Sequence, residues 1–334
     1  MRFSLRFNND MPATRFARLA ALAEDSGFDQ IWVSNDLFFQ SAAVLIAAAA
    51  TDTKRIALGA GVFNPVSMRA PEIAMVAASL NELSGGRFRL GLGAGADRFL
   101  AWAGLDRAPP VVRARAALRE LRDLFAGRTP EGFSPAARLW AAPVEIPLYV
   151  GAMGRRMLEL AGELADGALP LLFPPEHFRA ARRHVADGAA RAGRDLTGLD
   201  IAACVWCSIA DDAAAARRAM AAKIAYYGPS FAPELLKRAG LSTAHFAAIE
   251  DALAAGQPNL AADLVTPEML GLGIVGNAEA VLARCMSLVS AGADHISFGP
   301  PLGPDPERSI VTLGRAVVPV LRAAGRNEYD TLDI

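Results

Sequence analysis

Short runs of β-forming residues alternate with longer helix-forming segments along most of this chain, and no other feature constrains its fold as much. A predicted strand at residues 2–7 precedes a predicted helix at 13–26, and the same order returns at 30–34 and 41–51. Such alternation is the signature of βαβ units, which assemble into a parallel sheet covered by helices. Continued to the C-terminus, the pattern yields eight predicted strands, at residues 2–7, 30–34, 55–62, 87–91, 148–151, 167–171, 201–208 and 295–298. We therefore predict an α/β fold with a single (β/α)8 TIM barrel.

The length of the chain agrees with one barrel that carries an insertion. A (β/α)8 barrel takes about 250 residues, and this chain has 334. Between the seventh and eighth predicted strands, residues 210–284 are far more sequence than one helix needs. We expect one domain over residues 1–334, with residues 210–284 forming a helical insertion over the barrel mouth. Two other breaks, at 107–110 and 129–147, are too short to separate two domains.

The composition points to a small molecule as partner. Hydrophobic residues make up 53% of the chain, charged residues 21%, and the formal net charge is −1. The apolar content supplies a large core, and no basic excess favours nucleic acid. The longest purely apolar run, residues 42–50, is nine residues long, whereas a membrane-spanning helix needs roughly 20. We expect neither nucleic acid nor a membrane as partner.

The cysteine content and the first residues predict a cytoplasmic protein. Three cysteines in a chain this long argue against a disulfide framework and suit a reducing compartment. The chain opens directly on the first predicted strand, without the charged start and apolar stretch of a secretory signal peptide.

A glycine-rich segment follows the fourth predicted strand. Residues 91–96 read Gly-Leu-Gly-Ala-Gly-Ala and match the dinucleotide-binding pattern G-x-G-x-x-G/A. A Rossmann fold places that pattern in its first βα turn, whereas here it follows a later strand, with Pro109 and Pro110 soon after. Two readings remain open. Gly93 and Gly95 either let the backbone approach a ligand at the barrel mouth or simply form a tight turn.

A second such segment joins the fifth predicted strand to the following helix. Gly151, Ala152, Met153 and Gly154 are mostly small residues, and they lead into a helix that begins near Arg155. The free backbone N–H groups at the positive end of a helix suit a phosphate. An ordinary strand-to-helix turn is the alternative.

Polar residues follow several predicted strands at the point where each strand ends. In a (β/α)8 barrel the carboxyl ends of the strands converge on the active site. Polar residues at loop starts are also common caps and turn formers, so the set counts for more than its members. The set consists of Asn8, Ser34, Asn35, Asp36, Asn64 and Asp97.

The cysteine and histidine spacings give no support to a metal site. Cys204 and Cys207 have C-x-x-C spacing, but in a strand they face opposite sides and no second pair follows. We predict buried structural thiols. The four histidines show no H-x-x-x-H or H-E-x-x-H spacing, and no G-x-S-x-G segment indicates a hydrolase.

Several segments together carry a family resemblance that spans nearly the whole chain. They lie at residues 23–28 with Trp32, and at 59–65, 80–87, 91–95, 151–154, 165–167 and 299–305. With these segments the chain resembles the luciferase-like superfamily, and within it the branch of coenzyme F420-dependent methylenetetrahydromethanopterin reductase. The resemblance implies a (β/α)8 barrel whose deazaflavin or flavin rests on a bulge in the third strand. It places a non-prolyl cis peptide at Gly61–Val62 and the cofactor phosphate at residues 151–154.

The chain also departs from the pattern of that branch. The reductases carry a glutamate in the first strand and an aspartate after the glycine loop, where this chain has Arg6 and Ala96. Their Asp-His pair after the second strand is Asn35-Asp36 here. The resemblance therefore implies a retained cofactor and an altered substrate.

Our main hypothesis is an F420-dependent oxidoreductase that transfers a hydride to or from a small organic substrate. Asp36 is the candidate acid or base, and Arg6 and Asn8 are candidates for orienting a polar or anionic substrate. The alternatives are an FMN-dependent monooxygenase that receives reduced flavin from a partner reductase, and an inactive member that only binds flavin or a protein. A homodimer, frequent in this family, is expected. The predicted cofactor-binding residues are Asn35, Gly61, Val62, Asn64, Gly93, Gly95, Gly151, Ala152, Met153 and Gly154.

Overall fold

The structure of the chain is a computed structural model that describes residues 1–95, 97–106 and 109–330. The chain divides into two compact units. The N-terminal unit consists of Ser4–Pro170 and Ala180–Ala202, and the C-terminal unit of Met1–Phe3, Leu171–Arg179 and Ala203–Ile334. Strands β1 (Arg2–Phe7) and β7 (Asp200–Ile209) contribute residues to both units. Within the described ranges, no helix has the length and apolarity to cross a membrane.

The strands of the N-terminal unit form a parallel sheet in the order β6-β5-β4-β3-β2-β1. Neighbouring strands pair in register, as Arg6 with Trp32 and Trp32 with Gly59 show. At one edge, β6 also pairs with the first residues of β7, through Gly167 and Asp200. The further strands are β2 (Gln30–Val33), β3 (Ala57–Phe63), β4 (Phe88–Leu92), β5 (Leu148–Ala152) and β6 (Gly167–Pro170).

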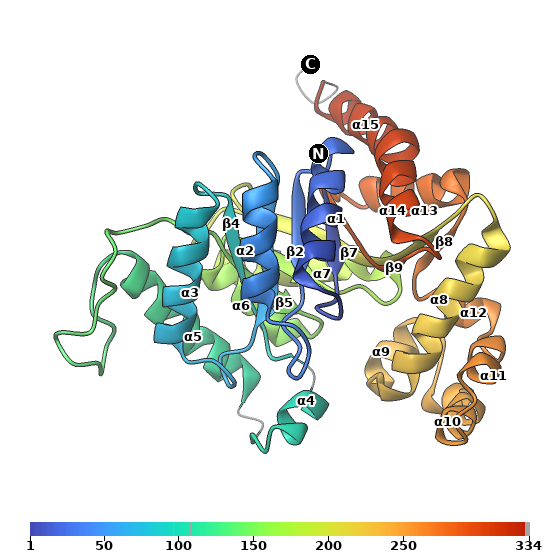
Figure 1. The fold of residues 1–334 in the computed structure, drawn as a ribbon, viewed down its shortest axis with the longest axis horizontal. Helices are drawn as coiled ribbons and strands as arrows, with labels where there is room; N and C mark the ends of the chain where they lie inside the picture. The colour runs from blue at the N-terminus through green and yellow to red at the C-terminus, as the bar shows by residue number, and fades with distance from the viewer. Residues whose placement is uncertain (96, 107–108, 331–334) are drawn as a thin grey trace. The chain divides into compact units, whose positions relative to one another are not determined.

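Helices connect these strands, and Figure 1 shows α1, α2 and α3 side by side. Helix α1 illustrates why they form, since Phe16, Leu19, Ala20 and Ala23 recur at helical spacing and are all buried. Gly27 follows its end in the left-handed conformation, at φ 83°. The helices are α1 (Ala13–Asp25), α2 (Ala42–Asp52), α3 (Ala70–Leu83), α4 (Asp97–Trp102), α5 (Pro110–Phe125), α6 (Arg155–Leu164) and α7 (Phe178–Arg191).

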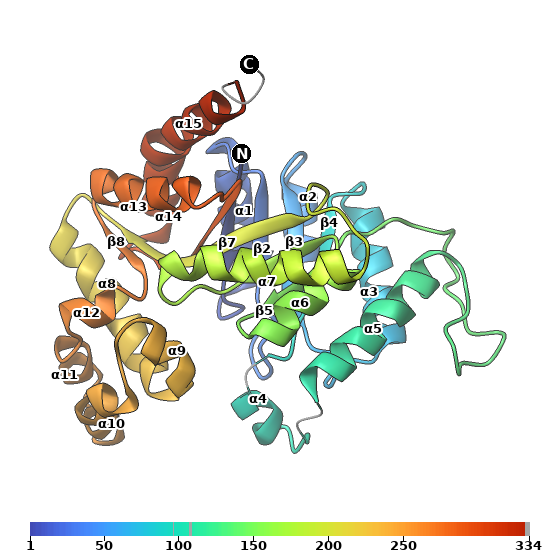
Figure 2. The ribbon, with the colours of Figure 1, turned by 180° about the vertical axis from the view of Figure 1, so that it is seen from behind.

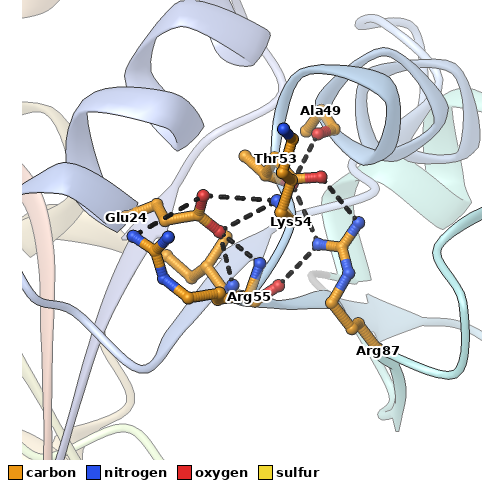
Figure 3. A network of polar contacts seen from close by, with 7 residues as sticks. Glu24, Ala49, Thr53, Lys54, Arg55 and Arg87 are labelled. Carbon is orange, nitrogen blue, oxygen red and sulfur yellow. Dashed lines mark hydrogen bonds and ion pairs between the residues drawn. The ribbon is translucent and has the colours of Figure 1, made fainter.

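Two charged side chains, those of Glu24 and Arg87, bind backbone groups at the amino ends of the strands in this unit (Figure 3). The Glu24 carboxylate accepts backbone N–H groups of Lys54, Arg55 and Ile56 at 3.0, 2.5 and 2.7 Å. Burial favours the neutral form of Glu24, but these three donors outweigh it and hold the pKa of the carboxyl below its usual value. The start of β3 is therefore tied to the end of α1.

Arg87, just before β4, donates to five acceptors that come from three neighbouring segments, and Figure 3 shows it beside one of them, Thr53. Its guanidinium binds the carbonyls of Ala50, Thr53 and Ile56 at 3.1, 3.0 and 2.8 Å, and the Thr53 hydroxyl at 2.9 Å. Its Nε binds the Ser84 carbonyl at 2.7 Å. These carbonyls end α2, precede β3 and follow α3, so one side chain joins three elements.

In the C-terminal unit, β7 lies between β9 (His295–Leu302) and β8 (Ile274–Gly276). Strands β7 and β8 pair in parallel through Cys207 and Ile274. The Arg2 N–H donates to the Asp294 carbonyl at 2.7 Å, which sets the start of β1 beside the start of β9.

Helices α9 to α12 gather beside α8 (Figure 2), around a core that includes Met220, Ile224, Leu236, Phe246 and Met269. Short 3-10 turns at Gly228–Ser230 and Thr243–Phe246 separate some of them. The helices of this unit are α8 (Ala213–Tyr227), α9 (Pro233–Arg238), α10 (Ala247–Ala254), α11 (Pro258–Asp263), α12 (Pro267–Leu270), α13 (Ala278–Ser290), α14 (Pro306–Thr312) and α15 (Val318–Asp330).

The predicted (β/α)8 barrel is confirmed. The eight predicted strands are β1 to β7 and β9, all joined in one sheet in which β6 also pairs with β7. The short strand β8 lies within the segment 210–284, where the sequence pattern does not predict it. Residues 213–270 of that segment are mostly helical, as expected. A single domain over 1–334, with the insertion over the barrel mouth, stays a prediction.

Candidate functional site

The inner face of the barrel is filled near the amino ends of its strands. Trp32 packs edge-on against Tyr149, with ring centroids 5.0 Å apart, and the Tyr149 hydroxyl donates to Asp200 Oδ2 at 2.8 Å. The space for these side chains comes from glycine, because a Cβ at Gly59 would lie 2.1 Å from the Trp32 ring and one at Gly167 2.2 Å from Tyr149. A ligand therefore has to bind at the carboxyl ends.

A bulge interrupts β3 at its carboxyl end. Pairing with β4 runs from Ala60 with Leu90 to Phe63 with Leu92, so β3 carries one extra residue. The Gly61–Val62 peptide is cis, which confirms the expectation from the family resemblance. The Val62 side chain lies over two neighbouring strands, since a Cβ at Gly93 or at Gly151 would each lie 2.7 Å from one of its methyl groups. Gly93 and Gly151 thus leave the room that Val62 occupies.

Asn64 joins the turn after β3 to the glycine loop after β4. Its side chain is buried, its Nδ2 donates to the Ala94 carbonyl at 2.6 Å, and its Oδ1 accepts from the Val66 N–H at 2.9 Å. Gly95 has a φ of 65°, and a Cβ there would lie 3.0 Å from Asn64 Nδ2. The tight-turn reading of the glycine loop therefore has direct structural support.

The loop after β2 is held by Asn9, a residue that sequence reasoning missed. The buried Asn9 side chain donates to the carbonyls of Asp36 and Gln40 at 2.9 and 2.6 Å. Its Oδ1 accepts from the Ser34 hydroxyl at 2.8 Å and from the Asp36 N–H at 3.2 Å. Both ends of the loop are thus fixed to Asn9, the second residue after β1. No local sequence signal marks this role, because the partners of the buried amide lie 25 to 31 positions along the chain.

The remaining predicted residues around this loop have distinct surroundings. Asp36 is half-buried, with Oδ2 3.2 Å from the Ser34 hydroxyl. Asn35 Oδ1 accepts from the Ala42 N–H at 3.1 Å, at the start of α2. Asn8 Nδ2 is 3.4 Å from Asp10 Oδ2. Arg6 is half-buried on β1 and shares the inner face with Trp32, because they are registered neighbours.

The segment from β5 to α6 is open to solvent. Gly154 precedes α6 with φ −100° and ψ 150°, and no side chain caps the helix. Since an α-helix leaves its first N–H groups without helical partners, donors remain available here. A Cβ at Gly154 would meet nothing within 4 Å, and Met153 is exposed. Arg155 donates to Glu159 Oε1 at 2.7 Å and is engaged on its own helix.

The predicted residues therefore gather at one edge of the N-terminal unit. Asn35, Asp36, Gly61, Val62 and Asn64 follow or end β2 and β3, while Gly93, Gly95 and the segment 151–154 follow or end β4 and β5. These four strands are consecutive neighbours in the sheet, so their carboxyl ends form one edge. Ala96 lies outside the described residues.

The thiols have the predicted character. Cys204, Cys207 and Cys285 are buried and free, and burial raises the pKa of Cys285 to about 12 and that of Cys207 well above its usual value. Among the described residues, ligand atoms of Glu159, His184 and Asp187 lie within 4.8 Å of one another on α6 and α7. Arg155 and Arg191 already neutralise Glu159, at 2.7 and 3.1 Å. The absence of a metal stays a prediction.

Comparisons with known proteins agree with this architecture. The family model of luciferase-like monooxygenases matches residues 3–295. The 5,10-methylenetetrahydromethanopterin reductase of Methanolobus tindarius is 34% identical over 326 residues, which cover 95% of this chain and 100% of that protein. The reductase of the same name from Archaeoglobus fulgidus is 32% identical over 332 residues, covering 96% and 100%.

A solved structure resembles the whole chain. The coenzyme F420 dependent tetrahydromethanopterin reductase from Methanopyrus kandleri has a TM-score of 0.87 and 29% sequence identity, and the match covers 96% of this chain and 99% of that one. The resemblance inferred from the sequence is thus confirmed over nearly its whole length.

Proposed function

Because the chain belongs to the luciferase-like monooxygenase family, we propose that it is an oxidoreductase that binds coenzyme F420 and exchanges a hydride with a small organic substrate. The relatives named above are methylenetetrahydromethanopterin reductases, and the solved relative is F420-dependent. One observation in the chain itself carries the proposal. The bulge at Gly61–Val62 and the uncapped start of α6 lie at the same edge of the sheet.

The residues at this edge fit a deazaflavin with a phosphate-bearing tail. A flat ring needs a surface without protruding side chains, and Val62 is seated over Gly93 and Gly151 rather than standing clear of them. A phosphate needs donors and room, and α6 supplies uncapped N–H groups beside Gly154, where a Cβ would meet no atom within 4 Å.

Each proposed residue then has a physical task. Gly61 and Val62 support the ring, while Gly154 and the first turn of α6 hold the phosphate. Bound F420 supplies a carbon that donates or accepts hydride, and the protein contributes position and charge. Asp36 exchanges a proton with the substrate, held in place by Ser34 and Asn9. Arg6 and Asn8 orient a polar or anionic group of the substrate.

An altered substrate is part of the proposal. Arg6 stands where the reductase branch has a glutamate, and a cation attracts groups that a carboxylate repels. A cytoplasmic location remains a prediction from the cysteine content. A homodimer is also proposed, with support from exposed Val44 and Met75 on the adjacent helices α2 and α3.

Titration of the apo protein with F420 and, separately, with FMN tests the cofactor. Calorimetry measures both titrations. We expect saturable binding of F420 at micromolar or lower concentration and much weaker binding of FMN. The reverse preference would replace the proposal with an FMN-dependent monooxygenase that needs a partner reductase. Binding of neither cofactor would favour an inactive member of the family.

Asp36→Asn is expected to lower kcat about 100-fold or more and to leave F420 affinity unchanged. An amide keeps the shape and an acceptor oxygen but cannot take or give the proton, and general acid–base catalysis contributes about 10²–10⁴ in rate. The assay follows F420 absorbance with a small organic substrate that the parent protein turns over, and 5,10-methylenetetrahydromethanopterin is the first compound screened. Asp25→Asn, an exposed carboxylate at the opposite ends of the strands, is the control. Equal rates for both variants would remove Asp36 from its proposed role.

A further inference from the structure

Four aromatic side chains from two separate loops form a cluster at the edge of the N-terminal unit. Phe38 and Phe39 belong to the loop after β2, and Phe99 and Trp102 to α4, after β4. Phe38 lies against Trp102 with ring centroids 6.2 Å apart, and Phe39 meets Phe99 edge-on at 6.0 Å. Phe99 in turn meets Trp102 edge-on at 5.4 Å. We call these four residues the aromatic cluster.

Most of the aromatic cluster faces solvent. Phe38, Phe39 and Trp102 are 68%, 50% and 61% exposed, and only Phe99 is buried. Large apolar side chains that gather on a surface mark a binding site more often than scattered ones do. Trp140 is the contrast, since it is fully exposed and has none of these ring contacts within the described part of the chain. Three rings of the cluster therefore present much of their surface to solvent, where a ligand can contact them.

The loop that carries Phe38 is fixed rather than loose. Asn9 binds the carbonyls at both ends of the loop, those of Asp36 and Gln40. Phe38 itself has a φ of 72°, a conformation that bulky residues rarely adopt and that persists where the surroundings impose it. The backbone thus holds an exposed phenyl ring outward at a defined place.

The aromatic cluster and the proposed cofactor platform, the bulge at Gly61–Val62, belong to neighbouring strands of the sheet. Strands β2 and β4 are the two neighbours of β3 in the sheet, and the cluster grows from the loops that follow them. The bulge at Gly61–Val62 therefore lies between the two strands whose loops meet in the cluster. A molecule that reacts with a ring on this bulge therefore lies at the end of the strand between the two whose loops carry the cluster.

We propose that the aromatic cluster binds the substrate, and that the substrate carries a flat, uncharged, conjugated ring. This inference rests on the proposed function, because it takes the bulge as the cofactor platform. Phenyl and indole rings contact such a ring by stacking or edge-on, and they offer no charge to an ionic head group. Phe38 and Trp102 then select the substrate, while the polar group that Arg6 and Asn8 orient is a separate part of it.

The test uses N-phenyl-1-naphthylamine, an uncharged flat-ring probe whose fluorescence rises on binding, with the full chain in the absence and presence of F420. We expect Trp102→Ala and Phe38→Ala to weaken probe binding at least tenfold, and Trp102→Phe to restore most of it. Trp140→Ala, which removes a fully exposed indole outside the cluster, is expected to bind the probe as the parent does. Circular dichroism and thermal melting confirm that each variant is folded.

Further measurements separate the other occupants of this surface. Unchanged F420 affinity in Trp102→Ala supports the substrate as occupant, whereas an equal loss of F420 affinity assigns the cluster to the cofactor ring and overturns the inference. It is also overturned if Trp102→Ala converts a dimer into monomers in sedimentation, or abolishes binding to phosphatidylcholine vesicles. Equal probe binding by parent and Trp102→Ala likewise overturns it. Failure of the parent to bind F420 would instead overturn the proposed function, because the probe titration does not need the cofactor.

Discussion

Gly154→Val is expected to weaken F420 binding about 10- to 100-fold without unfolding the protein. A hydrogen bond to a charged group is worth about 1.5–3 kcal/mol, and a valine at the start of α6 would stand where the phosphate approaches the N–H groups. The substitution meets no internal obstacle, since a Cβ here has nothing within 4 Å. The extended backbone of Gly154 is also one that valine adopts readily. Calorimetry with F420, beside a thermal melt, measures both effects.

Three comparison variants make this result specific. Gly198→Val places the same side chain on another exposed glycine with free space, and it is expected to bind F420 normally. Arg156→Ala is expected to cost much less affinity, because an exposed charge pair is worth about 0–1 kcal/mol. Gly151→Val is expected to disturb the fold as well, since its Cβ would already lie 2.7 Å from Val62. Normal F420 binding by Gly154→Val, with loss in Arg156→Ala, would place the phosphate elsewhere.

Arg87→Ala is expected to destabilise the protein by about 3 kcal/mol or more. Removal of the guanidinium leaves the carbonyls of Ala50, Thr53, Ile56 and Ser84 without this donor, in partly buried surroundings. Each buried polar group that loses its partner costs about 1–3 kcal/mol. Denaturation by urea, with the free energy of unfolding extrapolated to water, measures the loss.

The control for this experiment lies in the same network (Figure 3). The Arg55 side chain is 72% exposed, and its guanidinium makes a long contact of 3.9 Å with Glu24 Oε1. The short hydrogen bond to Glu24 comes from the backbone N–H of Arg55. Arg55→Ala keeps that backbone bond and is expected to cost less than about 1 kcal/mol. Similar losses for the two arginine variants would show that Arg87 acts as an ordinary surface charge.

The sequence pattern predicts the long elements well and the short ones poorly. The strands of the barrel stand out because apolar β-forming runs alternate with amphipathic helices such as α1, whose buried residues keep helical spacing. Strand β8 has three residues, Ile274–Gly276, between a glycine-rich turn and the start of α13, and α4 has six. Segments this short contain too few residues for a period to be visible.

The location of the candidate site could be predicted, but the partners of its side chains could not. Residues after parallel strands meet at one edge whatever their identity, which is why Asp36, Asn64 and the glycines fall together. Asn9 was missed because its partners Ser34, Asp36 and Gln40 lie 25 to 31 positions away. Gly93 and Gly151 were predicted to bind a cofactor, whereas in the fold a side chain at either position would first meet Val62. Such long-range contacts leave no mark in local sequence spacing.

The packing of Val62 against Gly93 and Gly151 restricts how these three positions can change in evolution. Because Gly93 and Gly151 leave the space that the Val62 methyl groups fill, these positions cannot diverge one at a time. A larger residue at 93 or 151 requires a smaller one at 62, so the three positions are expected to covary among descendants of this chain. The bulge and the start of the phosphate segment are thereby inherited together as one module. The ring contacts between the loops after β2 and β4 do not involve positions 62, 93 or 151, so new substrate preferences can arise there while the cofactor cradle stays unchanged.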